Sequence, residues 1–279
     1  MSRTVNYVEG AGAREPTVTG DALKTIRCLT VCAGIIGLAV PFGSCSQTVA
    51  TGHVEVLEVF AHDSTAYTQG LELLDGLLIE GTGRYGESTL RRVVPQTGEI
   101  VQKLMLDSMY FGEGVSVAGE MVLQLTWQEH VVFVYDAETF DVVDTLDLPT
   151  FGWGLCVSGS IAYLTGGGSV LYRRSLPEWD DLGFTEMERN GELLRDVNEL
   201  ECVGGYAYAN IYQSDTIVKI DLATGNVVAE FDASMLVPPH LRASPDAVLN
   251  GIAYDPASDS FYLTGKLWPV LYRVRMVLD

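Results

Sequence analysis

The sequence is poor in basic residues and in histidine. It contains 17 Lys and Arg against 37 Asp and Glu in 279 residues, a formal net charge of −20, and only four His. This small number of basic residues cannot form the basic surface that binds a phosphate backbone. Nucleic acid is therefore excluded as a partner, and binding to anionic membranes is disfavoured. Four His also argue against a metal centre built from several histidines, and we expect no metal site.

The remaining composition is that of a folded protein. Hydrophobic residues make up 47% and charged residues 19% of the chain, whereas a disordered acidic chain would be poor in apolar residues. The length suffices for one large domain or two small ones with a substantial core.

An apolar run at residues 28–42 follows Lys24 and Arg27 and precedes small residues and Cys45. A bilayer span needs about 20 apolar residues, so this shorter run is typical of an export signal. We interpret residues 1–45 as an export or lipoprotein-type signal and residues 46–53 as a short linker. The protein is then periplasmic, anchored to the cell envelope or secreted. Cys45 is a possible lipid anchor, with ordinary cleavage or a retained anchor as alternatives.

Without residues 1–44, the chain has 13 basic and 34 acidic residues, for a net charge of −21. Cys156 and Cys202 are the two cysteines in the body of the exported domain. They can pair in an oxidising compartment, but we expect two buried free thiols.

The exported part contains a repeat. Similar tripeptides begin at Gln69, Glu113 and Trp153, and looser copies begin at Asn198 and Asn250. These positions are 44, 40, 45 and 52 residues apart, and a period of forty-odd residues is typical of a propeller or solenoid.

Each repeat contains further β-rich runs separated by turns, which predicts four antiparallel strands per unit. The fourth strand of the third unit is expected within residues 179–197, and residues 232–249 are expected to form a loop over one face. The fifth unit ends without a fourth strand, whereas an additional strand, residues 54–60, precedes the first unit. We therefore predict a five-bladed β-propeller over residues 54–279, closed by that N-terminal strand joining the last blade. A β-sandwich or barrel would not explain five matching tripeptides.

Equivalent positions of five inner strands would converge on one axis. The tripeptide starts Gln69, Glu113, Trp153, Asn198 and Asn250 supply one carboxyl, three amides and an indole. A carboxylate among amides in a partly desolvated pocket suits proton transfer, because its pKa can be tuned. A polar channel filled with water is the alternative. Trp127, Tyr212 and Lys266 follow the second run of their units, so we expect them at the same end.

Seven ordered segments carry a family resemblance. They are Thr68-Gln69-Gly70-Leu71, Phe111-Gly112-Glu113-Gly114, Leu125-Thr126-Trp127, Gly152-Trp153-Gly154-Leu155, Asn198-Glu199-Leu200-Glu201, Asn250-Gly251-Ile252-Ala253-Tyr254-Asp255 and Thr264-Gly265-Lys266-Leu267-Trp268-Pro269. Together they resemble the plant and bacterial type of glutaminyl-peptide cyclotransferase, a five-bladed propeller family. The resemblance implies conversion of N-terminal glutamine of a peptide or protein to pyroglutamate with release of ammonia, with no required cofactor.

The resemblance also implies roles for individual residues. Glu113 would be the central acid/base, with Gln69, Asn198 and Lys266 as polar companions in catalysis. The substrate-binding residues would be Tyr67, Phe111, Trp127, Trp153 and Tyr212, and we add Asn250 as the fifth axial residue. The family has Phe where this chain has Tyr67, Trp where it has Tyr212, and an aromatic residue where it has Cys202. We expect a monomer.

Two other functions remain open at this point. A non-catalytic propeller that binds a peptide or sugar is compatible with an exported acidic domain and an aromatic pocket. A propeller hydrolase or lactonase that uses calcium would need several carboxylates on the axis, where we expect only Glu113.

Overall fold

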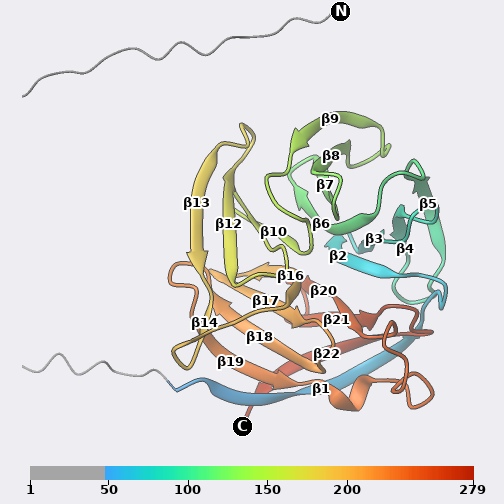
Figure 1. Ribbon diagram of the computed structural model, residues 1–279. Helices are drawn as coiled ribbons and strands as arrows, with labels where there is room; N and C mark the ends of the chain where they lie inside the picture. The colour runs from blue at the N-terminus through green and yellow to red at the C-terminus, as the bar shows by residue number, and fades with distance from the viewer. Residues whose placement is uncertain (1–47) are drawn as a thin grey trace, which may run out of the picture. The chain divides into compact units, whose positions relative to one another are not determined.

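The computed structural model describes residues 48–279, in which nearly all the regular structure is β (Figure 1). This confirms the all-β prediction. The predicted signal, including Cys45, lies outside the described residues. Within residues 48–279 no helix is both long and apolar enough to cross a membrane.

Three sheets have four strands each, in chain order from one edge to the other. The first comprises β2 (Thr68–Leu74), β3 (Leu77–Thr82), β4 (Thr89–Val93) and β5 (Ile100–Met105). The second comprises β6 (Gly112–Ala118), β7 (Met121–Thr126), β8 (Val131–Asp136) and β9 (Val142–Asp147). The third comprises β10 (Leu155–Ser158), β11 (Ile161–Leu164), β12 (Val170–Ser175) and β13 (Asp181–Glu186). The last of these lies within residues 179–197, as predicted. A small hairpin, β14 (Glu188–Arg189) and β15 (Glu192–Leu193), follows it.

The other long strands of residues 48–279 form one eight-stranded sheet, in the order β16-β17-β18-β19-β1-β22-β21-β20. Its bounds are β16 (Val197–Val203), β17 (Tyr206–Ile211), β18 (Thr216–Asp221), β19 (Val227–Asp232), β20 (Leu249–Asp255), β21 (Ser260–Gly265), β22 (Val270–Leu278) and β1 (Ala50–Ala61). A short 3₁₀ turn, η1 (Ser234–Leu236), lies in the predicted loop between β19 and β20.

The N-terminal strand joins the two halves of this large sheet. β1 pairs antiparallel with β22, as predicted, and its first four residues also pair in parallel with β19. Because of this second pairing the strand begins at Ala50. The prediction that residues 50–53 belong to a linker is therefore wrong.

Alternating burial shows how the outer strand β5 forms. Along β5, residues Ile100, Gln102 and Leu104 are partly buried, whereas the intervening Val101, Lys103 and Met105 are exposed. This period of two matches a strand with one face against a neighbouring sheet and one in water.

The first strands of the units lie in a closed ring. β2 contacts β6, β6 contacts β10, β10 contacts β16, β16 contacts β20, and β20 contacts β2. The approach is so close that a Cβ added to Gly154 would lie 1.9 Å from the carbonyl oxygen of Asn198 on the neighbouring strand. Glycine in the repeated tripeptide is therefore required by packing between adjacent units.

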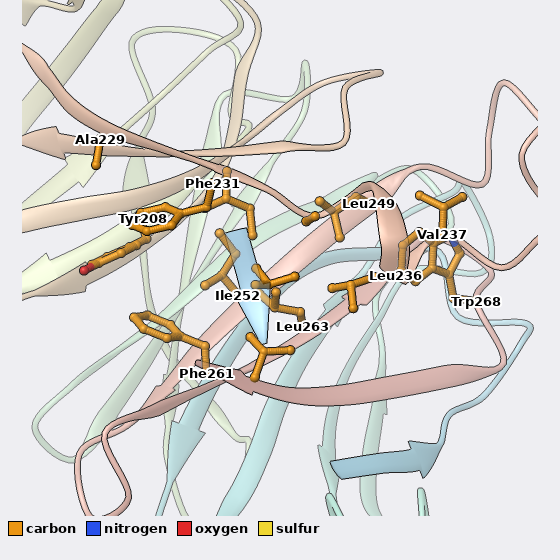
Figure 2. Close-up of a cluster of buried hydrophobic side chains, with 14 of the residues drawn as sticks. Tyr208, Ala229, Phe231, Leu236, Val237, Leu249, Ile252, Phe261, Leu263 and Trp268 are labelled. Atoms are coloured by element: carbon orange, nitrogen blue, oxygen red, sulfur yellow. The ribbon is translucent and has the colours of Figure 1, made fainter. Parts of the chain in front are cut away.

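A hydrophobic cluster fixes the long β19–β20 loop to the large sheet (Figure 2). Leu236 and Val237 of the loop pack with Ile252, Leu263 and fully buried Trp268. The indole Nε1 of Trp268 also donates to the Ala247 carbonyl oxygen at 2.9 Å. Since Trp268 lies two residues after Lys266, this cluster anchors the turn that carries the only predicted catalytic cation.

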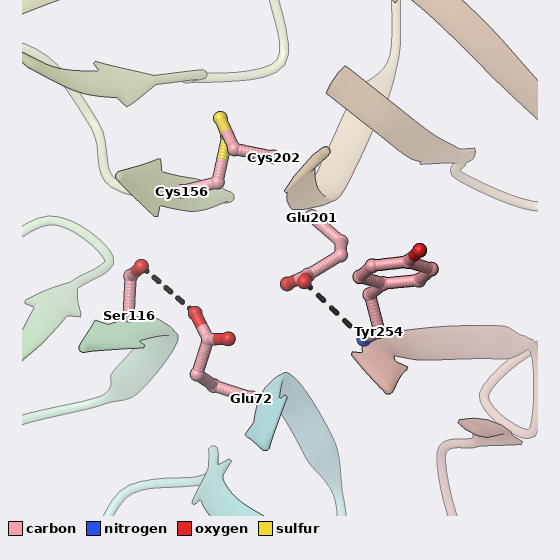
Figure 3. The surroundings of a disulfide bond; sticks show 6 residues. All are labelled: Glu72, Ser116, Cys156, Glu201, Cys202 and Tyr254. Atoms are coloured by element: carbon pink, nitrogen blue, oxygen red, sulfur yellow. Dashed lines mark hydrogen bonds between the residues drawn. A yellow bond between two sulfur atoms is a disulfide. The ribbon is translucent and has the colours of Figure 1, made fainter. Parts of the chain in front are cut away.

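The structure joins Cys156 and Cys202 in a disulfide, so the expectation of two free thiols is wrong (Figure 3). The first cysteine lies on β10 and the second on β16, so the bond links the first strands of two neighbouring sheets. The bond closes 46 residues of chain, which makes it an effective constraint on the unfolded state.

We expect the loss of this disulfide to destabilise the domain by about 2–4 kcal/mol. Thermal unfolding of the double variant Cys156→Ala/Cys202→Ala, and of the wild type with and without dithiothreitol, measures the effect. A variant that unfolds at the wild-type temperature would show that the bond does not stabilise the fold. Dithiothreitol should not change the Tm of the double variant, which makes that variant its own control.

Candidate active site

Nine of the ten predicted site residues line one cavity of about 320 Å³. They are Tyr67, Gln69, Phe111, Glu113, Trp127, Trp153, Asn198, Tyr212 and Lys266. The residues come from all three four-stranded sheets and from both halves of the eight-stranded sheet. A larger cavity of about 790 Å³ between the second and third sheets has mainly apolar walls, and Asp144 is its only ionisable residue, so it offers no acid/base pair.

The polar residues are positioned by a repeated irregularity of the first strands. Gln69, Glu113 and Asn198 are each the second residue of their strand, and each lies where the pairing with the next strand shifts register. Such β-bulges turn a side chain away from its regular direction and recur next to active sites. The bulges set the direction of these three side chains, but β20 has the same shift at Asn250, which does not line the cavity, so the bulge alone does not account for the site.

Glu113 and Gln69 are joined at the base of the cavity. The Gln69 Nε2 donates to Glu113 Oε1 at 3.0 Å, and both residues are 3% exposed. Burial raises the pKa of Glu113 well above its usual range, Lys266 opposes this rise, and Glu129 adds to it. The Glu113 carboxyl group can thus hold a proton at a higher pH than an ordinary glutamate can.

Lys266 is the cation of the cavity. It is 3% exposed, and burial lowers the pKa of its ammonium to about 8 although Glu113 and Asp246 favour the charged form. Its Nζ lies 4.9 Å from the ring centre of Tyr67 and 5.4 Å from that of Tyr212. The two aromatic faces stabilise a cation that has lost most of its water.

Five half-buried aromatic residues form the walls. Phe111 lies between Tyr67 and Trp127, with ring centres 6.3 and 5.5 Å away, and Trp153 lies 5.7 Å from Tyr212. Tyr67 and Tyr212, where the family resemblance predicts Phe and Trp, still take part in this lining. The cavity therefore combines a polar floor with apolar walls.

A buried ion pair between His62 and Glu80 lies against the Lys266 turn. His62 lies within 3.0 Å of Glu80 through Nε2 and 2.9 Å of the Trp268 carbonyl oxygen through Nδ1. Both ring nitrogens face acceptors, which suits an imidazolium. Burial alone would lower the pKa of His62, but Glu80 raises it above its ordinary value. The same Glu80 oxygen accepts from Thr68 at 2.7 Å, so one carboxylate ties the Lys266 turn to the strand of Gln69.

Asn250 is the predicted site residue that the structure does not bring to the cavity. Its Nδ2 donates to the carbonyl oxygens of Thr68 at 2.9 Å and Gln69 at 3.3 Å. Its side chain therefore joins the first strands of two sheets, and the prediction that it binds substrate receives no support from its position.

Sequence reasoning missed several charged residues at the mouth. Glu129 accepts hydrogen bonds from the Tyr85 hydroxyl at 2.7 Å and from the Phe111 backbone N–H at 3.3 Å. Arg84 lies over the Tyr67 ring, 4.5 Å from its centre. Trp127 directly follows β7, whereas Arg84 and Tyr85 lie two and three residues after the end of β3, so the repeat does not align them with Trp127. The loop residue Asp246 has no counterpart in the other units.

Three further glutamates lie on first strands, outside the set of tripeptide-start residues in which we expect only Glu113. Glu72 on β2 and Glu199 and Glu201 on β16 are buried close enough to affect one another (Figure 3 shows Glu72 and Glu201). Burial raises the pKa of Glu72 to about 7 and that of the other two well above the usual range. Even so, no group of three or more His, Cys, Asp or Glu within residues 48–279 has an arrangement suited to a metal ion.

The chemistry open to the cavity follows from these groups. Glu113 can accept and return a proton, and Lys266 can stabilise a developing negative charge. The Gln69 Oε1 and Asn198 Oδ1 atoms are buried without a hydrogen-bond partner, so each can accept one from a bound donor. A bound molecule that presents both an amine and an amide could interact with all of these groups.

Comparison with known proteins agrees with this chemistry. The glutamine cyclotransferase family matches residues 29–276. The chain is 33% identical to a glutaminyl-peptide cyclotransferase of Arabidopsis thaliana over 289 residues, which cover 99% of this chain and 90% of the relative. The crystal structure of Myxococcus xanthus glutaminyl cyclase matches with a TM-score of 0.77 and 32% identity, covering 83% of this chain and 99% of that one.

Proposed function

We propose that one carboxyl group, Glu113, moves the protons of the reaction that this chain catalyses. The chain belongs to the glutamine cyclotransferase family, and it converts the N-terminal glutamine of peptides to pyroglutamate with release of ammonia. The observation that carries the proposal is a single buried carboxyl with a raised pKa in a cavity that also holds a buried cation.

The α-nitrogen of the substrate must lose two protons, and the leaving nitrogen must gain one. The α-ammonium group gives its first proton to the Glu113 carboxylate, and the free amine attacks the side-chain carboxamide carbon to close a five-membered ring. Glu113 then gives this proton to the leaving nitrogen, which departs as ammonia, and the regenerated carboxylate takes the second proton from the ring nitrogen and passes it to water. An α-ammonium has a pKa of about 7.7–8.0, so the raised pKa of Glu113 makes it a better matched base than an ordinary carboxylate.

The remaining groups position the substrate and stabilise charge. Attack is intramolecular, so aromatic walls that hold the glutamine side chain folded supply much of the acceleration. One amide N–H of Gln69 donates to Glu113, so the donors for the developing oxyanion are Lys266 and either the Asn198 amide or the second N–H of Gln69. The unpartnered oxygens of Gln69 and Asn198 would accept from the substrate ammonium.

This assignment predicts a bell-shaped dependence of kcat on pH. The rate should rise as Glu113 loses its proton and fall as Lys266 loses its own near pH 8. Lys266→Met should lower kcat about a hundredfold and abolish the fall on the alkaline side. The exposed Lys103→Met variant is the matched control. An unchanged alkaline limb in Lys266→Met would show that another group titrates there.

A direct assay separates catalysis from simple binding. The purified protein is incubated with a short peptide that begins with Gln, and the peptide mass is followed for the loss of one ammonia. We expect complete conversion. A folded protein that binds the peptide without changing its mass would instead support the peptide-binding propeller.

We also propose a finer description of the fold and setting. The ring of first strands and the β1–β22 pairing support a five-bladed propeller, with β1 as the outer strand of the last blade. The disulfide supports export to an oxidising compartment. We propose that no cofactor is required, because the proton transfers and the oxyanion stabilisation use side chains alone.

A further inference from the structure

A second hollow, of about 420 Å³, lies next to the active-site cavity. Its walls come from the β17–β18 turn and from the β19–β20 loop. Gln213 of its lining directly follows Tyr212, and Val248 of its lining accepts a hydrogen bond from the Lys266 backbone N–H at 2.9 Å. The hollow therefore borders the segments that carry Tyr212 and Lys266.

A peptide substrate needs such a surface. The active-site cavity is at the small end of the range for ligand pockets, and its polar floor is occupied by groups that act on the glutamine itself. The residues that follow the glutamine must therefore leave through the mouth. The hollow has both polar and charged groups, including Asp215 and Arg242, and suits a peptide backbone better than an apolar ligand.

The loop segment between the two spaces carries Asp246. Its neighbours Pro245 and Ala247 line the hollow, whereas the Asp246 carboxylate acts electrostatically on Lys266 and Tyr67 of the active site. The side chain of Asp246 is 62% exposed. A peptide that extends from the active-site cavity into the hollow would thus run past a negative charge.

Arg84 neutralises this charge only in part. Its Nη2 lies 4.0 Å from Asp246 Oδ2, and both side chains are more than a third exposed, so the pair is weak. The Arg84 guanidinium instead lies over the Tyr67 ring. The Asp246 carboxylate remains accessible to a cation of the substrate.

From these observations we propose that the hollow binds the residues after the N-terminal glutamine and that Asp246 selects substrates with a basic side chain there. This inference rests on the proposed function and adds a substrate class to it. The net charge of −20 acts in the same direction, because it attracts cationic peptides to the protein as a whole.

Kinetics with three matched tetrapeptides test the charge preference. Gln-Lys-Ala-Ala should have a kcat/KM about fivefold above that of Gln-Glu-Ala-Ala at low ionic strength, with Gln-Ala-Ala-Ala between them. The preference should fall below about twofold in 0.5 M NaCl because salt screens exposed charges. Equal values for the lysine and glutamate peptides at low salt would overturn the proposal.

Two rim variants should act in opposite directions. Asp246→Asn leaves Arg84 unopposed, so the lysine preference should vanish or invert. Arg84→Gln leaves Asp246 unopposed, so the preference should increase about twofold or more. Asp75→Asn removes the same charge from a turn outside both cavities, at a left-handed position that Asn tolerates, and is the control for net charge. If Asp246→Asn and Asp75→Asn change the preference equally, Asp246 has no specific role.

The hollow itself is tested by filling it. Ala243 lines it, and Ala243→Trp should lower the ratio of kcat/KM for Gln-Ala-Ala-Ala to that for glutamine amide about tenfold, because only the tetrapeptide reaches the hollow. An unchanged ratio, with the variant folded, would place the peptide elsewhere. Failure of the wild type to cyclise any of these substrates would instead overturn the proposed function and this inference with it.

Discussion

Glu113→Gln is expected to lower kcat about a thousandfold while KM stays within about threefold of the wild type. The substitution keeps the shape of the side chain and can keep the contact with Gln69, but it removes the group that accepts and returns the proton. Aromatic contacts hold the substrate and are unchanged, so binding should persist. Steady-state kinetics on a Gln-peptide, with circular dichroism to confirm folding, measure the effect.

The matched control is Glu120→Gln, at an exposed turn position between β6 and β7. It removes one carboxylate from the surface and should leave kcat unchanged. A Glu113→Gln variant that retains near-normal turnover would remove Glu113 from the mechanism, and a comparable loss in Glu120→Gln would attribute the effect to net charge.

Gly154→Ala is expected to disrupt both the fold and the site. The new Cβ would lie 1.9 Å from the Asn198 carbonyl oxygen and 2.9 Å from its carbonyl carbon, and backbone atoms cannot yield as a flexible side chain can. We expect a loss of about 3 kcal/mol and a Tm lower by about 5–10 °C. Because the displaced residue is Asn198, kcat should fall as well.

Gly168→Ala provides the comparison, since an added Cβ there meets nothing within 4 Å and the backbone is not left-handed. Its stability should stay within about 0.5 kcal/mol of the wild type. Thermal unfolding of Gly154→Ala and Gly168→Ala under the same conditions compares their Tm values. Equal Tm values would show that the strands can separate and that their close approach is not a constraint.

The sequence predicted the strands well because the repeat aligns five copies of one pattern. A single short apolar run is ambiguous, but matching tripeptides with following runs at similar distances fix the start of each unit. The extent of β1 was less predictable. Residues 50–53 owe their strand conformation to parallel pairing with β19, a contact that no local pattern records.

The disulfide illustrates a different limit. Cys156 lies three residues after its tripeptide start and Cys202 four residues after its own, so their positions in the repeat do not match exactly. The pairing therefore could not be read from spacing alone.

The site was predicted where the repeat applies and missed where it does not. Glu113, Gln69 and Asn198 share one position of the first strand, and the structure brings them together. Asn250 has the same position in its strand, but its side-chain amide donates to backbone carbonyl oxygens of the neighbouring strand β2. Asp246 belongs to a loop unique to its unit, so its place at the mouth depends on how Trp268 and the hydrophobic cluster hold that loop.

The most direct test of the central claim is a titration of the Glu113 carboxyl group itself. The difference infrared spectrum between the wild type and Glu113→Gln isolates the C=O stretch of its protonated form as pH is varied. We predict that this signal disappears at a pH well above the usual carboxyl range and coincides with the acidic limb of the kcat profile. A carboxylate that is already ionised at pH 5, while kcat still rises between pH 6 and 7, would contradict the assignment of Glu113 as the proton carrier.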